Sequence, residues 1–341
     1  MTPSAPNVAI LGAGLCGLLI ANELKQKNIL AHVFEKSRGT GGRMASKHWE
    51  WGQANIGAQY FTARDNDFRE LINSWVEEGI AKQWNFTPYK IENGKLVASP
   101  DNGERFVGSP DMTSITRYLA RNISITTNVR IEKCALEENQ QWTLVDGNKQ
   151  QHGPFDFVIT TLPAEQSNDL FPLHTELHRE IHRPCWAVAL ATKCISGSQI
   201  PSEIQGIFGD EQFSWVSRQS ALQNVTSQEF DDIWLLHSAP QWTTSHGKDY
   251  STHINQTAKT WLEKTLQQAL TIVHQEHHFW RYANIVGAPN ADIRVPSDTT
   301  VLSSNESSLL ISGAWQHSGK VEGAFLAARD CVKQLTGALN N

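Results

Sequence analysis

The chain has 341 residues, of which 40% are hydrophobic and 19% charged, which is typical of folded proteins rather than disordered ones. Its formal net charge is −6, and Lys and Arg are scattered singly, so nucleic acid is not an expected partner. No apolar stretch reaches membrane-spanning length and residues 1–6 form no basic leader, which predicts a cytoplasmic protein without a membrane partner.

The N-terminal segment predicts a βαβ unit. Residues 8–11 form a short apolar run, residues 15–27 have helical periodicity, and residues 30–34 form a second strand-like run. A helical pattern follows at 67–79. Residues 84–106 then have an alternating pattern that is interrupted by turn signals. This order indicates an α/β fold that makes an early excursion into a second domain.

The rest of the chain predicts a return to the first domain and a long second excursion. The further expected elements are strands at 123–131, 142–145, 155–161, 186–195, 232–237 and 309–313, and helices at 113–121, 250–268 and 321–335. We therefore expect a discontinuous nucleotide-binding domain formed by 1–66, 108–164 and 285–341. A β-rich α+β substrate domain is expected from 67–107 and 165–284.

A glycine pattern joins the first expected strand to the first expected helix. Gly12, Gly14 and Gly17 have the G-x-G-x-x-G spacing that allows a tight turn and a close approach of pyrophosphate to the backbone. The start of the helix then faces the phosphate charge. Glu35 ends the second strand, where a carboxylate can accept both ribose hydroxyls. Together these residues predict a dinucleotide site.

A second glycine-rich run follows Glu35 and ends in Gly41-Gly42-Arg43. This run resembles the flavin amine oxidase superfamily, in which it lies directly after the ribose-binding acid. The resemblance implies that FAD is the dinucleotide, that the arginine neutralises its phosphate, and that the glycines let the flavin end pass close to the backbone.

Four further runs are similar to the renalase-like branch of that superfamily. They are residues 57–65, 239–242, 280–283 and 319–325, and the resemblance covers residues 8 to about 335. It implies a Rossmann-like FAD domain resembling that of p-hydroxybenzoate hydroxylase, with a β-rich substrate domain over the flavin. In the closing run, a helix N-terminus would face the flavin pyrimidine, where reduced flavin carries negative charge.

The resemblance also implies which residues contact a non-covalent FAD. They are Gly12, Gly14, Leu15, Cys16, Gly17, Glu35, Lys36, Gly42, Arg43, Gly57, Ala58, Gln59, Tyr60, Val129, Thr161, Gly313, Glu322, Gly323 and Ala324. Val129 is expected on a strand near the adenine, and Gln59 and Tyr60 beside the isoalloxazine. The chain departs from the family at Ala314, where an acid usually bonds the ribityl chain, at Lys320, where arginine is common, and at Asn55, where aspartate is common.

The renalase-like resemblance implies a small-molecule substrate. Such enzymes oxidise 2- and 6-dihydro isomers of NAD(P) to NAD(P)+ and reduce O2 to H2O2. Tyr60, Trp215, Trp242 and Trp315 are expected to form a flat aromatic slot, with Arg218 or Arg281 at the substrate phosphate. His317 is the candidate acid or base, because histidine most often takes that role.

Other functions stay open at this point. The wider superfamily favours an amine oxidase or dehydrogenase, a flavin-binding sensor needs no catalysis, and a colourless protein would favour an NAD-dependent dehydrogenase. His274, His277 and His278 have no zinc-protease spacing and no supporting cluster of Cys or Asp. No metal is expected.

Overall fold

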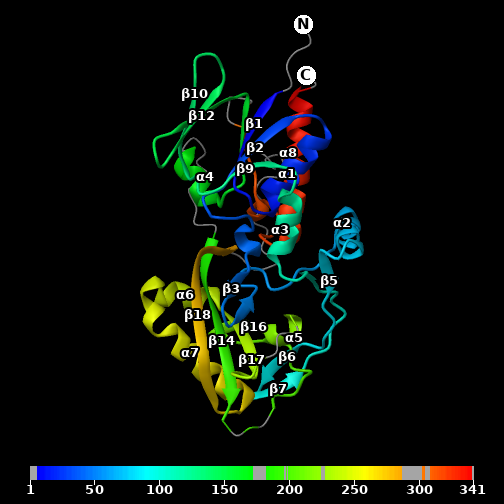
Figure 1. The fold of residues 1–341 in the computed structure, drawn as a ribbon, viewed down its shortest axis with the longest axis vertical. Helices are drawn as coiled ribbons and strands as arrows, with labels where there is room; N and C mark the ends of the chain where they lie inside the picture. The colour runs from blue at the N-terminus through cyan, green and yellow to red at the C-terminus, as the bar shows by residue number, and fades with distance from the viewer. Residues whose placement is uncertain are drawn as a thin grey trace.

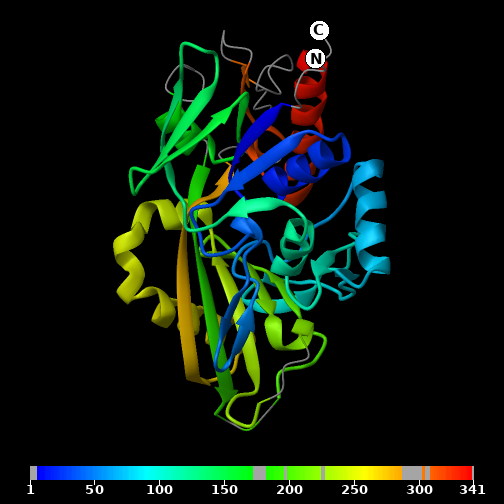
Figure 2. The ribbon, with the colours of Figure 1, turned by 45° about the horizontal axis from the view of Figure 1, so that its top comes forward.

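The computed structural model describes residues 6–171, 182–195, 197, 199–223, 227–285, 302–303 and 308–339. Two large sheets lie one beyond the other along the long axis of the molecule (Figure 1). The first and last helices, α1 (Leu15–Gln26) and α8 (Val321–Leu339), run side by side in the upper part (Figure 2). The two ends of the chain therefore build one lobe.

The upper lobe is built on a six-stranded sheet with the order β19-β20-β13-β1-β2-β9. All its neighbouring strands are parallel except β19, which runs antiparallel to β20. Its strands are β1 (Asn7–Leu11), β2 (Leu30–Phe34), β9 (Ser124–Thr126), β13 (Phe157–Thr160), β19 (Leu302–Ser303) and β20 (Leu309–Ile311).

Alternation along β1 explains the layers of this lobe. Val8 and Ile10 pack with α1, α3 (Thr113–Ala120) and α8 on one face. Ala9 and Leu11 pack on the other face against a three-stranded antiparallel sheet. Because successive side chains of a strand point to opposite faces, a central strand covered on both sides is apolar throughout. The small sheet comprises β10 (Ile131–Leu136), β11 (Trp142–Asp146) and β12 (Gln151–Phe155).

The lower lobe is built on a seven-stranded sheet with the order β18-β14-β17-β16-β15-β6-β7. Neighbouring strands are antiparallel except for β15 and β6. Its strands are β6 (Tyr89–Glu92), β7 (Lys95–Ala98), β14 (His182–Cys194), β15 (Gly206–Phe208), β16 (Phe213–Arg218), β17 (Asp232–Ser238) and β18 (Leu270–Ile285).

The two faces of β14 have different side chains and different partners. Trp186, Val188 and Leu190 are buried with α7 (Ile254–Leu266). Ala187 and Ala189 alternate with them and pack with the hairpin of β3 (Lys47–Trp49) and β4 (Gly52–Ala54). Small side chains allow the hairpin to lie close to the sheet, so a segment that follows the nucleotide-binding turns is held against the lower lobe.

The predicted α/β class, with a Rossmann-like sheet and a second β-rich domain, is confirmed. The exact domain boundaries stay a prediction. The remaining elements are η1 (Gly42–Met44), α2 (Asn66–Glu77), β5 (Ala81–Gln83), β8 (Phe106–Gly108), α4 (Ala164–Leu170), α5 (Gln219–Gln223), α6 (Pro240–His246), η3 (Lys248–Thr252) and η4 (Ala314–Gln316). Within the described ranges, no helix combines the length and apolar character needed to cross a bilayer.

Two expected elements were wrong in their extent. The strand expected at 123–131 ends at Thr126, because Asn128 has a φ of +58° and the backbone N–H of Val129 instead donates to the Glu35 carbonyl. The helix expected at 250–268 is a 3-10 turn followed by α7, with His253 between them as the N-cap of α7. Val129 therefore lies in a loop rather than on a strand.

Candidate functional site

The predicted glycine turn lies between β1 and α1. Gly12 has a φ of +106°, which favours glycine, and a Cβ on Gly17 would stand 2.1 Å from the Gly12 carbonyl oxygen. A Cβ on Gly14 would meet nothing within 4 Å. The chain is thus tightly packed at Gly12 and Gly17 but open at Gly14, directly at the start of α1, where backbone N–H groups favour an anion.

Glu35 closes the other side of this turn. Its Oε2 accepts from the backbone N–H of Ala13 at 2.8 Å, and its Oε1 accepts from that of Ser37 at 2.8 Å. The structure therefore holds the carboxylate at the carboxyl end of β2, beside the glycine turn. Parallel strands place ligand-binding groups at this edge of a sheet.

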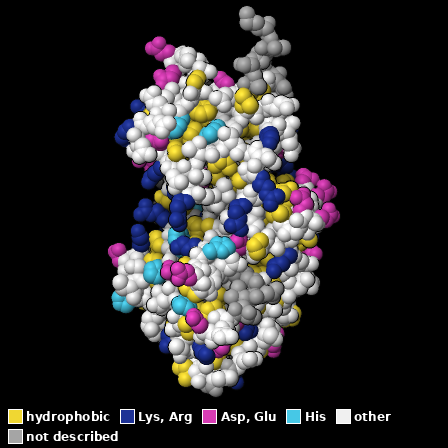
Figure 3. Space-filling view, in the orientation of Figure 1, with side chains coloured by type: hydrophobic (Ala, Val, Ile, Leu, Met, Phe, Trp, Pro, Cys, Tyr) yellow, Lys and Arg dark blue, Asp and Glu magenta, His cyan; other side chains and the backbone are white. Residues whose placement is uncertain are grey.

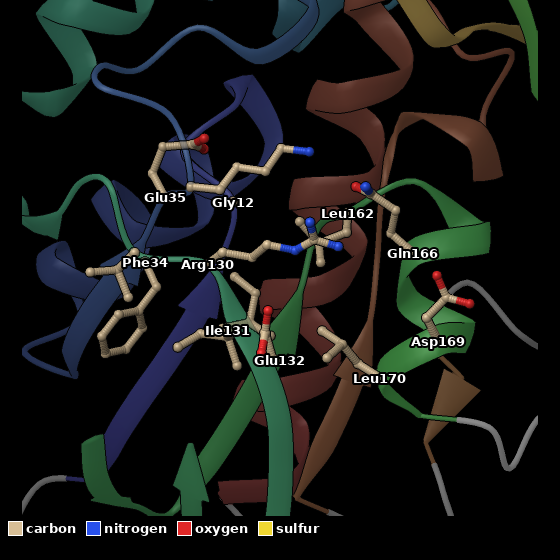
Figure 4. Close-up of a pocket in the computed structure, with 13 residues that line it drawn as sticks. Gly12, Phe34, Glu35, Arg130, Ile131, Glu132, Leu162, Gln166, Asp169 and Leu170 are labelled. Atoms are coloured by element: carbon tan, nitrogen blue, oxygen red, sulfur yellow. The ribbon is translucent and has the colours of Figure 1, made fainter. Parts of the chain in front are cut away.

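A cavity of about 300 Å³ opens next to Glu35. Gly12, Lys36 and Val129 also line it, so the structure brings together four of the residues predicted for the cofactor. Figure 4 shows Arg130 extending across the opening toward Leu162, with Gln166 and Asp169 of α4 on the far side. Arg130 was not predicted, because an exposed residue in a loop leaves no periodic signal.

The second glycine run folds back onto the first. Gly42 has a φ of +52°, and a Cβ added to it would lie 3.3 Å from the Cα of Gly14. The Arg43 carbonyl accepts from the N–H of Ala58 at 2.7 Å, and a Cβ on Gly57 would stand 2.1 Å from that same carbonyl oxygen. The segments at Gly14, Gly42 and Gly57 are therefore packed together in one place.

Arg43 is held in this place by weak contacts. Its Nη1 donates to the carbonyls of Ala283 and Gly319, each at 3.3 Å. Burial lowers the pKa of its guanidinium, and in the part of the chain that the structure describes no carboxylate lies within ion-pair distance of it. The Glu165 carboxylate acts on it only from beyond ion-pair distance, and a part-buried cation without a close counter-charge is costly unless a ligand supplies one.

The start of α8 meets the loop after Tyr60. Oε1 of Glu322 accepts from the backbone N–H groups of Arg64 and Asp65, at 2.6 and 2.7 Å. A Cβ on Gly323 would stand 2.0 Å from the His317 carbonyl oxygen, and Ala324 is buried beside it. Only glycine fits at position 323, so the start of the helix lies close to the preceding turn.

Other predicted cofactor residues lie around the first turn. Thr161 donates from Oγ1 to the Leu11 carbonyl at 3.0 Å and fixes the end of β13 against β1. Leu15 and Cys16 are buried in the first turn of α1. Burial raises the pKa of the Cys16 thiol to about 12, so this cysteine is a neutral packing residue and not a nucleophile.

Gln59, Tyr60 and Trp215 form the centre of a second group of predicted residues. The indole Nε1 of Trp215 donates to Oε1 of Gln59 at 3.1 Å, and its ring meets that of Tyr60 edge to face at 5.1 Å. Arg105 lies over the Tyr60 ring at 5.4 Å from its centroid, and Trp84 meets the ring edge at 6.4 Å. Burial raises the pKa of Tyr60, so its hydroxyl stays protonated.

Arg105 is a residue that the sequence did not reveal. It is 6% exposed, and its guanidinium pairs with Asp101, with 2.9 Å between Nη1 and Oδ1. Its Nε is buried without a hydrogen-bond partner. Because Asp101 balances its charge, Arg105 brings hydrogen-bond donors to this aromatic group rather than a free positive charge.

Two predicted aromatic residues lie elsewhere. Trp242 is on α6, where it stacks on His246 at 4.0 Å and packs against the core of the lower lobe. Trp315 is 4% exposed in the upper core, and its Nε1 donates to the Leu162 carbonyl at 3.2 Å. A Cβ on Gly313 would stand 2.5 Å from that Nε1, so Gly313 makes room for the indole. Neither indole has a ring contact with Tyr60 or Trp215 in the described ranges.

The predicted polar substrate residues are also apart from Tyr60. Arg218 donates from Nη2 to Oδ2 of Asp232 at 2.8 Å and from Nη1 to the Pro201 carbonyl at 3.0 Å. His317 bonds to Oδ2 of Asp330 through Nε2 at 2.8 Å. Arg281 is exposed on β18. Arg218 and His317 thus have protein partners that account for their positions.

The three histidines of β18 have separate partners. His274 lies 3.2 Å from Oε2 of Glu229, Nδ1 of His277 lies 3.1 Å from Oδ1 of Asn255, and His278 packs on Trp280 at 4.5 Å. The described residues include no cluster of three or more metal-ligating side chains.

Comparisons with known proteins support the same architecture. The family model of the NAD(P)-binding Rossmann-like domain matches residues 10–75. The chain is similar to an Exiguobacterium sp. protein assigned as a protoporphyrinogen oxidase, with a TM-score of 0.75 and 11% identity over 97% of this chain and 99% of that one. It is also similar to putrescine oxidase bound to putrescine, with a TM-score of 0.67 and 12% identity over 98% and 99%.

A third solved structure, from Pyrococcus furiosus, has a TM-score of 0.65 and 13% identity over 97% of both chains. Each of these likenesses extends over nearly the whole chain, so both lobes belong to one shared fold and not only the glycine turn.

Proposed function

We propose that this protein is an FAD-dependent oxidoreductase that holds its flavin without a covalent bond. The observation that carries the proposal is Arg43, a part-buried cation directly after Gly42, which packs on Gly14; its described neighbours are carbonyl oxygens, with no carboxylate at ion-pair distance. A pyrophosphate would supply the missing negative charge. The donor set and the space at Gly14 thus fit a dinucleotide.

Different residues of the chain would bind different parts of the dinucleotide. Glu35 accepts from the ribose hydroxyls, and Val129 and Lys36 line the adenosine cavity. The start of α1 and Arg43 meet the pyrophosphate. The segment 57–60 and the start of α8, at Glu322, Gly323 and Ala324, lie along the ring end. Ala314 offers no hydrogen bond to the ribityl chain.

The bound flavin would accept a hydride and hand the electrons to an acceptor. Tyr60 and Trp215 supply flat faces that orient a planar substrate and exclude water. The carboxylate that acts on Tyr60, that of Asp101, is paired with Arg105, which suits hydride transfer without a protein base.

We further propose the renalase-type reaction, in which a 2- or 6-dihydro isomer of NAD(P) and O2 take up one proton and give NAD(P)+ and H2O2. The run at 57–65, the aromatic pair and the inward-facing Arg105 support it. Lys and Arg side chains also gather across the middle of one face, between the lobes, although the chain is acidic overall (Figure 3). Such a band attracts phosphate-bearing substrates.

Amine oxidation is the second candidate, because the fold is shared with a putrescine oxidase. An alkylammonium ion, however, would find the Asp101 carboxylate beside Tyr60 already paired with Arg105. We therefore expect amines to reduce the flavin more slowly than dihydronicotinamides.

The test is the visible spectrum of the purified protein during anaerobic addition of 2- and 6-dihydronicotinamide dinucleotides, ordinary NADH and an amine panel. Rapid bleaching by the isomers alone supports the renalase-type reaction, and bleaching by amines alone supports the second candidate. A yellow protein that no donor reduces would be a flavin-binding sensor. A protein that takes up no FAD overturns the proposal.

A further inference from the structure

A chain of buried polar side chains leads to Gln59 from the lower lobe. Nε1 of Trp215 and Oγ of Ser217 both donate to Oε1 of Gln59. Nε2 of Gln219 donates to Oγ of Ser217 at 2.6 Å, and Oε1 of Gln219 accepts from the backbone N–H of Asn55 at 3.0 Å. The four side chains of Gln59, Trp215, Ser217 and Gln219 are at most 9% exposed. We call them the amide relay.

The relay fixes which way the Gln59 amide faces. An indole N–H can only donate, so the atom of Gln59 opposite Trp215 must be the oxygen. The Ser217 hydroxyl oxygen accepts a hydrogen bond from Gln219, so the hydroxyl can donate its own hydrogen to Gln59. A flipped Gln59 amide would set its NH2 group against the Trp215 N–H. The hydrogen-bond chemistry thus determines this amide orientation.

The same orientation leaves the NH2 group of Gln59 without a partner. Its Nε2 is buried and has no hydrogen-bond partner, although Gln59 is only 3% exposed. Most buried polar atoms in folded proteins are paired, and an unpaired donor is costly. Gln59 immediately precedes Tyr60, and Trp215 contacts both residues. The side chain that carries the unpaired donor is therefore bonded to the aromatic group where we propose that the flavin and the substrate meet.

We infer that Gln59 is a hydrogen-bond donor for a carbonyl oxygen or an unprotonated ring nitrogen of a bound ligand, and that Trp215 and Ser217 are its positioning residues. The inference rests on the proposed function. The acceptor belongs either to the flavin ring or to the substrate ring. An ammonium group cannot fill this place because it has no acceptor.

The experiment compares Gln59→Leu, Gln59→Glu, Ser217→Ala and Ser217→Thr in the FAD-loaded protein. Three quantities are measured for each: the FAD dissociation constant, the visible flavin spectrum, and the affinity for nicotinamide as a carboxamide probe, with benzylamine as the ammonium control. Thermal unfolding of each variant shows that it is folded. Loss of one buried donor should weaken binding of the ligand that carries the acceptor about tenfold.

The two sources of the acceptor give different results. If the acceptor belongs to the flavin, Gln59→Leu raises the FAD dissociation constant about tenfold. It also shifts the visible flavin bands when no nicotinamide is present. If it belongs to the substrate, FAD affinity is unchanged and nicotinamide binds about tenfold more weakly. In either case Ser217→Ala gives a smaller loss in the same direction, and Ser217→Thr, which keeps the hydroxyl, restores it.

Gln59→Glu separates a donor from a merely structural residue. An ionised carboxylate still accepts from Trp215 and Ser217 but has nothing to donate, whereas a protonated carboxyl donates its O–H. The affinity of this variant for FAD or for nicotinamide, whichever carries the acceptor, should therefore rise as the pH falls. A packing role would not produce this pH dependence. Folded variants that take up FAD and match the wild type in all three quantities overturn the inference. A wild type that takes up no FAD overturns the proposed function itself.

Discussion

The two ends of the candidate site are assembled in different ways. On the nucleotide side, the Glu35 carboxylate bonds to Ala13 and Ser37, which are 22 and 2 residues away. On the aromatic side, Gln59 bonds to Trp215 and Ser217, which are 156 and 158 residues away. The first end is built from one local segment with glycine-limited backbone geometry. The second exists only after β16 has paired within the seven-stranded sheet.

This difference has an energetic consequence. A turn that depends on glycine fails when one Cβ is added, because backbone atoms cannot move out of the way. A side-chain network fails when one partner is removed and the other is left buried and unpaired. The two ends should therefore respond to opposite kinds of substitution, and four variants can test this.

The largest effect is expected from Gly17→Ala. Its Cβ would stand 2.1 Å from the Gly12 carbonyl oxygen, which is backbone, so we expect a loss of about 4–5 kcal/mol in the free energy of unfolding. Urea unfolding measures it. Gly14→Ala is the matched control, since its Cβ meets nothing within 4 Å. That variant should keep its stability but take up FAD poorly. Equal stability of the two variants would contradict the glycine argument.

The next effect is expected from Arg218→Met in the lower lobe. Asp232 has a side chain that is only 4% exposed and pairs with Arg218, so the substitution leaves a buried carboxylate without its cation. We expect about 3–4 kcal/mol of destabilisation. The double variant Arg218→Met with Asp232→Asn should recover part of it. Flavin reduction by folded Arg218→Met should be unchanged, and a selective loss of substrate binding would restore the role predicted from sequence.

The fold could be predicted from sequence where residues near one another determine it. Val8 to Gly17 contains a strand, a turn and a helix start, and the structure has all three. The extent of the strand that was expected to include Val129 could not be predicted, because it depends on a hydrogen bond to Glu35 from a distant segment. The long strand β18 escaped notice because its buried and exposed residues do not alternate regularly.

The candidate site follows the same division. Glu35 was predicted because it ends the second expected strand, and Arg43 and Gln59 because their runs resemble the flavin amine oxidase superfamily. Arg105 and Ser217 were not found, since nothing in a single sequence shows that they meet Tyr60 and Gln59. Trp315 and Arg218 have the residue types that a substrate site needs, but the structure pairs them with Leu162 and Asp232. Residue type alone does not reveal which partner a side chain has.

Arg43→Met should affect binding rather than folding. Removing a desolvated cation that has no described carboxylate partner should leave the apoprotein equally or slightly more stable. The FAD dissociation constant should rise about 100-fold, the effect of losing one buried charge pair. Titration of the apoprotein with FAD, followed by flavin fluorescence, measures it. Arg281→Met, which removes an exposed arginine, is the control and should change FAD affinity by less than about threefold. Strong destabilisation of the Arg43 variant would indicate a structural role instead.

The smallest effect concerns acid stability of the lower lobe. Burial lowers the pKa of His237 from 6.5 to about 4, and its ring bonds to the Ile56 carbonyl at 3.0 Å. Between these two pKa values the unfolded chain therefore binds a proton on His237 that the folded chain does not bind. The stabilisation is present above about pH 6.5 and is lost as the pH falls toward 4, by about 2 kcal/mol at pH 5.

His237→Gln tests this pH dependence directly. Glutamine can donate to the same carbonyl but does not titrate, so the variant should lose about 2 kcal/mol less than the wild type between pH 7 and pH 5. His278, whose pKa burial also lowers to about 4, still contributes acid sensitivity, so the variant does not become pH-independent. Urea unfolding at both pH values measures the difference. Equal losses in the two proteins would show that His237 titrates normally, and the contact between Ile56 and the seven-stranded sheet would then not depend on a neutral ring.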